Sequence, residues 1–92
     1  MVAEALAILL RQLGTEAARG LVYWLTGRTV DATVGALLAK AARGQTLTPQ
    51  EIEQLRYLLI RQAAQAPAQP QINIDELAAK VAEVLRRQGY LK

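Results

Sequence analysis

The side chains that most often do covalent or acid–base chemistry are absent from this sequence. It contains no Cys, no His and no Ser at any of its 92 positions. Thiolate, imidazole and serine nucleophile chemistry therefore lack the groups on which they depend. Carboxylates, Lys, Tyr and Thr remain, scattered along the chain. The composition predicts a protein that is not an enzyme, with no catalytic residues, no metal and no cofactor.

Two carboxylate pairs are the best remaining candidates for acid–base work. Glu51 and Glu53 lie two residues apart in an expected helix, so their side chains point to different sides. Asp75 and Glu76 are adjacent at the start of another expected helix, where the helix dipole favours acidic residues. Helix capping accounts for both pairs, so neither pair predicts a catalytic site.

The net charge of +3 raises the question of nucleic-acid binding. Acidic and basic residues alternate along the chain, and no segment collects a run of five or six basic residues. This distribution is more typical of a solvated surface than of a phosphate-binding track. Nucleic acid therefore stays an alternative partner, and its contacts would come from Arg11, Arg19, Arg28, Lys40 and Arg43.

Residues 9–28 (LLRQLGTEAARGLVYWLTGR) resemble a degenerate helix-turn-helix of the repressor type. Thr15 stands where such a motif has an apolar turn residue, and Gly20 stands where it has a buried aliphatic one. The spacing to the WLTGR ending is also one residue too long. Recognition positions 16–19 offer only one good reader of bases, Arg19. A small DNA-binding regulatory protein is thus the alternative interpretation, not the preferred one.

The spacing of apolar residues predicts an all-α bundle of four to five helices. From Val2 to Leu25 apolar residues recur at steps of three and four, which predicts a helix over about 2–26. Gly14 either kinks this helix or breaks it. Further helices are expected over residues 30–43, 49–65 and 74–88.

Local signals define the starts of the last two expected helices. Thr48-Pro49-Gln50-Glu51 predicts a capping box with Pro at the first helical position. Asn73-Ile74-Asp75-Glu76 predicts a second box. Between these helices, residues 66–73 form a Pro/Gln connector. We therefore expect a helical core unit over 1–65 and a C-terminal amphipathic docking helix within 74–92.

The only Trp of the chain, Trp24, closes the first apolar stripe together with Tyr23 and Leu25. Part of this stripe can form the core, and part can bind a partner, because Trp and Tyr bury large areas with few rotamers. The tail helix has about two apolar heptads, too few for a coiled coil on its own, so it docks on its own bundle or on a neighbouring subunit. The predicted partner interface is Leu6, Leu9, Leu10, Leu13, Leu21, Tyr23, Trp24, Leu25, Ile74, Leu77, Val81, Val84 and Leu85.

These features favour a structural or adaptor protein that acts by homo-oligomerisation or by docking in a larger assembly. Apolar residues make up 52% of the chain but aromatic residues only 4%, so its small side chains bury little area and self-association would bury more. The sequence lacks Ser, is rich in Ala, Leu, Arg and Gln, and has a Pro-containing connector before its last expected helix. This composition is typical of a virion or mobile-element component.

The location expected from the sequence is the cytoplasm or the interior of a virion or other assembly. Glu4 stands where a secretion signal has basic residues, and no stretch of about 18 uncharged apolar residues could span a membrane. A second alternative is a helical bundle that lies on a membrane surface with Trp24 at its apolar edge. The alternating charges disfavour it, because such helices carry Lys and Arg beside the apolar face.

Overall fold

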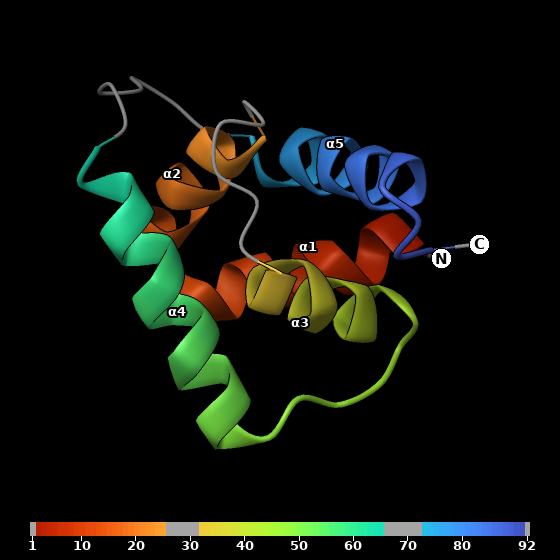
Figure 1. Cartoon of the computed structure of the whole chain (residues 1–92), viewed down its shortest axis with the longest axis horizontal. Helices are drawn as coiled ribbons and strands as arrows, with labels where there is room; N and C mark the ends of the chain where they lie inside the picture. The colour runs from red at the N-terminus through yellow and green to blue at the C-terminus, as the bar shows by residue number, and fades with distance from the viewer. Residues whose placement is uncertain (1, 26–31, 66–72, 92) are drawn as a thin grey trace.

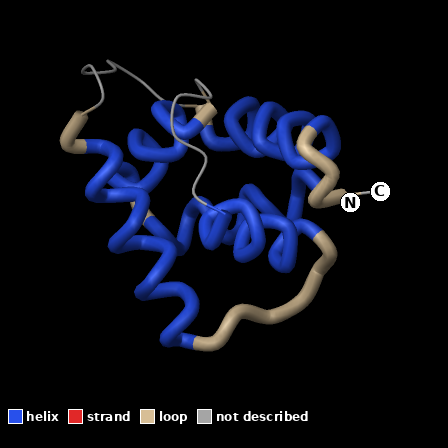
Figure 2. Tube along the Cα trace, in the orientation of Figure 1, coloured by secondary structure: helices blue, strands red, loops and turns tan. Residues whose placement is uncertain are grey.

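Five α-helices form the computed structural model, which describes residues 2–25, 32–65 and 73–91. In these ranges every regular element is a helix and no strand occurs (Figure 2). The predicted all-α bundle is therefore confirmed. The helices are α1 (Val2–Leu13), α2 (Thr15–Trp24), α3 (Ala32–Ala42), α4 (Pro49–Ala63) and α5 (Ile74–Arg87).

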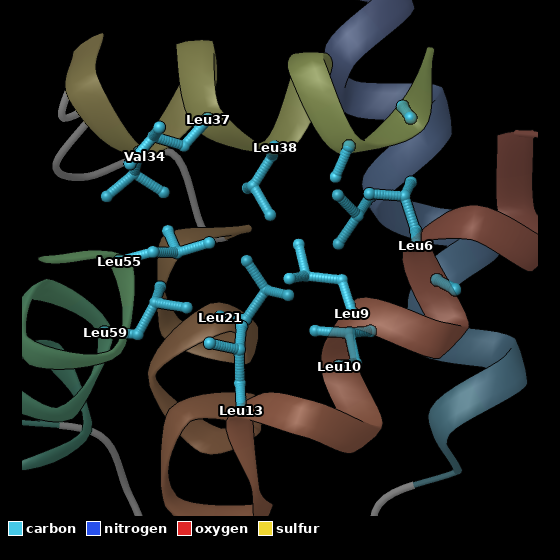
Figure 3. Packing of buried hydrophobic residues seen from close by; sticks show 14 of the residues in the cluster. Leu6, Leu9, Leu10, Leu13, Leu21, Val34, Leu37, Leu38, Leu55 and Leu59 are labelled. Atoms are coloured by element: carbon cyan, nitrogen blue, oxygen red, sulfur yellow. The ribbon is translucent and has the colours of Figure 1, made fainter. Parts of the chain in front are cut away.

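The helices are arranged around α1, which runs through the middle of the bundle (Figure 1). α5 packs along one side of α1 and α3 along another, and α2 packs against α4. The beginning of α1 and the ends of α3 and α5 meet at one end of the molecule (Figure 1). Leucines from α1, α2, α3 and α4 point toward one another in the space between these helices (Figure 3). The largest fully buried side chains are Trp24, Leu6, Leu10, Leu21, Leu38, Leu55, Leu59, Leu85, Val34 and Val81.

Gly14 breaks the first apolar stripe into two helices instead of only kinking it. Its φ of 93° lies in the left-handed region, where a glycine has no steric cost. The N–H of Gly14 donates to the carbonyl of Leu10, and the carbonyl of Gly14 accepts from the N–H of Ala18. Gly14 thus makes one backbone hydrogen bond to each of the two helices, and the chain changes direction between them. Of the two outcomes expected at Gly14, the structure has the break.

The predicted capping box at the start of α4 is complete. The Thr48 hydroxyl accepts from the backbone N–H of Glu51 at 3.1 Å, and a Glu51 carboxylate oxygen accepts from the N–H of Thr48 at 2.9 Å. At the start of α5, only half of the predicted box is formed. The Asn73 side chain accepts from the N–H of Glu76 at 3.2 Å, while the Glu76 carboxylate lies 3.6 Å from Lys80 Nζ. Both helices therefore begin where their local sequence predicts.

The backbones of α2 and α4 approach each other very closely at Gly20. A Cβ atom at this position would lie 1.7 Å from the carbonyl oxygen of Leu59. This oxygen belongs to the α4 backbone, so it cannot move aside as a flexible side chain could. Gly20 is therefore required for the contact between the two helices.

We expect Gly20→Ala to destabilise the fold by about 3 kcal/mol or more, because the added methyl forces α2 away from α4. Urea denaturation followed by circular dichroism measures the change. Gln54→Ala, on the exposed face of α4, is the control and should change stability by less than about 0.5 kcal/mol. Equal stabilities of the two variants would show that the helices do not meet at Gly20.

A second expected outcome concerns pH and the Glu51 carboxylate. Its hydrogen bond from the Thr48 N–H and its contacts with Lys40 Nζ, at 2.9 and 3.1 Å, lower the pKa of Glu51 below its ordinary value. Because the folded pKa is lowered, ionised Glu51 stabilises the fold above the unfolded pKa, and this contribution is lost as the pH falls through the folded pKa.

Glu51→Gln keeps a capping acceptor but removes the charge, so its stability should fall less on acidification than that of the wild type. Thermal unfolding at a series of pH values from about 7 to about 3 measures this difference. Glu16→Gln, at an exposed position of α2, should retain the wild-type profile. A Glu51→Gln profile parallel to the wild type would contradict the assignment.

Candidate interaction surface

Most of the predicted interface residues lie in the core of the chain itself. The same apolar stripe that could meet a partner is instead covered by the neighbouring helices of the bundle, so these side chains are not available at the surface. Their assignment as partner contacts stays a prediction. The residues concerned are Leu6, Leu9, Leu10, Leu13, Leu21, Trp24, Leu77, Val81 and Leu85.

The remaining predicted interface residues are half-buried. Leu25, Ile74 and Val84 pack against the edge of the core, and Tyr23 is also partly covered. They belong to α5, to α2 and to the residue that follows α2. Because these side chains already bury part of their area within the chain, they offer a partner only their outer edges.

Trp24 is a core residue with 2% of its surface exposed. Its indole Nε1 is buried without a hydrogen-bond partner, and so are Arg19 Nε and Gln62 Oε1. An unpaired buried N–H carries a desolvation cost, which the burial of the large apolar ring offsets. The ring therefore stabilises the bundle.

The tail helix packs in cis. α5 lies along α1 of the same chain, and Arg11 Nη2 lies 3.2 Å from Asp75 Oδ1 between them. Its buried face, Leu77, Ala78, Val81, Ala82 and Leu85, joins the same cluster as the leucines of α1 and α3. Of the predicted connector, only Asn73 falls inside the described residues.

Two of the basic residues named for nucleic acid are held in ion pairs, Arg11 with Asp75 and Lys40 with Glu51. Arg43 is exposed, and Arg28 lies outside the described residues. Arg19 is half-buried.

The helix-turn-helix interpretation meets a similar obstacle in α2. Ala17 and Ala18, two of its recognition positions, are 0% exposed. A recognition helix must present these positions to base edges, whereas α2 buries them in the core.

The clearest apolar surface of the described chain surrounds Ile8. This side chain of α1 is 57% exposed, and it stands beside a groove of about 410 Å³ between α1 and the segment that joins α3 to α4. Sequence reasoning missed Ile8 because the residue lies outside the main stripe. An isoleucine on the otherwise polar face of Glu4, Arg11 and Gln12 was the available signal. The groove is lined chiefly by Ala5, Leu9, Gln12, Gln45, Leu47 and Ile52.

The other large apolar side chain that is exposed among the described residues is Tyr57 of α4, at 61%. The Arg61 guanidinium lies 5.7 Å from the centre of its ring, within the range of a cation–π contact. Tyr57 lines none of the grooves found among the described residues. Tyr57 is therefore a weaker candidate for an interaction surface than Ile8.

Comparisons with protein families, with curated proteins and with solved structures give no match for this chain. Within the described residues, no group of three or more His, Cys, Asp or Glu side chains could hold a metal ion. No helix in the same part of the chain is long and apolar enough to cross a membrane.

The burial of Trp24 gives a direct spectroscopic expectation, because it is the only Trp. Its fluorescence in the folded protein should be blue-shifted and insensitive to iodide, and both properties should be lost in denaturant. Stern–Volmer quenching before and after unfolding measures this. Strong quenching in the folded protein would place the ring at the surface.

Proposed function

We propose that this chain is a non-enzymatic structural protein that assembles with copies of itself through the surface around Ile8. The observation that carries the proposal is that one surface has both an exposed apolar side chain and an apolar groove. Ile8 stands out from α1, and the apolar groove lies directly beside it. A two-fold contact needs such a surface, since each copy must offer both halves of the fit.

The chemistry of the surface suits a protein contact. It is lined by the apolar side chains of Ile8, Ala5 and Ile52 and by the amides of Gln12 and Gln45. Protein interfaces generally combine apolar side chains with polar groups that form hydrogen bonds. Full burial of an isoleucine side chain contributes about 1.5–3 kcal/mol, and Ile8 has more than half of its surface left to bury.

The size of the surface indicates how the contact would be used. A stable pairwise interface takes in about 20–30 residues of each partner. The groove is lined by ten residues, so it does not supply such an interface alone. A weak contact repeated over many copies gains strength from multivalency. A particle built from many copies, such as a virion or a mobile-element assembly, is therefore the setting we propose.

Sedimentation velocity over a wide range of protein concentrations tests the proposal. The wild type should associate reversibly, with a weight-average mass that rises with concentration. Ile8→Glu should remain monomeric at every concentration, because two carboxylates would be buried at the contact. A wild type that stays monomeric throughout would overturn self-assembly.

Ala36→Glu is the matched control for this experiment. It places the same charge at an exposed position of α3 that does not line the groove beside Ile8. It should associate like the wild type. If both variants lost association equally, net charge and not the Ile8 surface would control assembly.

A further inference from the structure

A second groove lies at the end of the bundle where α1 begins and α3 and α5 end (Figure 1). Its main hollow has a volume of about 440 Å³, within the range of about 300–1,000 Å³ that small-molecule pockets occupy. A neighbouring hollow of about 290 Å³ shares Val2 and Arg86 with it and extends over Ala79 and Ala82 of α5. The main hollow is lined chiefly by Val2, Ala42, Arg43, Arg86, Tyr90 and Leu91.

The wall of this groove formed by Tyr90 and Leu91 is held in place by α5 and α3. Gly89, with φ 87°, ends α5, and the N–H of Tyr90 turns back to donate to the carbonyl of Leu85 at 2.9 Å. The Tyr90 ring lies against Gly35 of α3, where a Cβ would come within 2.6 Å of it. The groove is therefore a formed feature of the fold.

The charges at the groove are unbalanced. In the described chain, Arg11, Lys40, Arg56, Lys80 and Arg87 each form an ion pair with a carboxylate. No such pair is formed among the described residues by Arg43 or Arg86, the two basic residues that line the groove. Arg43 donates one long hydrogen bond, of 3.4 Å, to the carbonyl of Tyr90, which leaves most of its N–H groups for a ligand.

Cations near the C-terminal ends of helices also complement the helix dipole, and this is the simplest alternative account of the two arginines. It explains a basic residue at the end of α5, but Arg87 already provides one there. It does not explain why two guanidinium groups without an ion pair, those of Arg43 and Arg86, flank the same apolar hollow. A ligand with an apolar body and an anionic head accounts for both features.

We propose that the groove binds a single-chain fatty carboxylate. Its chain lies over Val2, Ala79 and Ala82, and its carboxylate pairs with Arg43 and Arg86. The planar guanidinium fork matches a carboxylate and holds it by two parallel hydrogen bonds. The groove shares no lining residue with the Ile8 surface, so this inference is independent of the proposed self-assembly.

Isothermal titration with decanoate, kept below its micelle concentration, tests the proposal. Decanoate should bind with a stoichiometry near one. Decanol and decyltrimethylammonium should bind at least about tenfold more weakly, because one lost charge-assisted hydrogen bond is worth about 1.5–3 kcal/mol. Equal affinity for decanol, or no binding of decanoate, would overturn the proposal.

Arg86→Gln should weaken decanoate binding by about tenfold or more. Arg61→Gln removes the same charge from α4, away from the groove, and should bind like the wild type. Ala79→Leu fills the apolar part of the groove and should also weaken binding. Thermal unfolding checks that each variant is folded. Equal losses in Arg86→Gln and Arg61→Gln would assign the binding to net charge and overturn the site.

Phosphatidylglycerol vesicles distinguish a free fatty acid from a membrane surface. The proposal expects no co-sedimentation with these vesicles beyond that of the Arg86→Gln variant, together with binding of monomeric decanoate. Co-sedimentation of the wild type without decanoate binding would replace the proposed site with a membrane-surface contact.

Discussion

The backbone contact of α2 with α4 at Gly20 is the constraint on which the bundle depends. Because the two helices meet without a side chain between them, Leu21 and Trp24 of α2 are carried into the core. Gly14 joins α2 to α1 with a single residue, so the position of α2 also limits where α1 can lie. α3 and α5 then cover the sides of α1 that α2 and α4 leave open.

Local chemistry made much of the fold predictable. The cap at Thr48 depends on residues within one turn, so it could be found without knowledge of the rest of the chain. The spacing of apolar residues in α1 also predicted which of its side chains are buried. It did not predict what would cover them, because one stripe serves equally well as a core and as an interface. The role of Gly20 in helix packing could not be predicted from the sequence, because the residue that it contacts, Leu59, is distant in sequence.

The candidate surfaces were harder to predict than the core. Ile8 is one apolar residue on a polar face, and its importance comes from the groove beside it, which residues of α1 form with the segment after α3. Arg43 was named only as a nucleic-acid contact and Arg86 was not singled out, and the two line one groove only through the packing of α5. The two surfaces differ in character, since one is neutral and the other combines apolar walls with positive charge.

The small buried side chains have a consequence for how this sequence can change. Ala17, Ala18, Ala39 and Ala78 are almost fully covered, and the close approach of the helices leaves no space around such residues. A leucine can be exchanged for another apolar residue of similar volume at modest cost, whereas a buried alanine can grow only if two helices separate. A divergent relative would therefore retain the positions of its smallest residues longer than the identities of its largest.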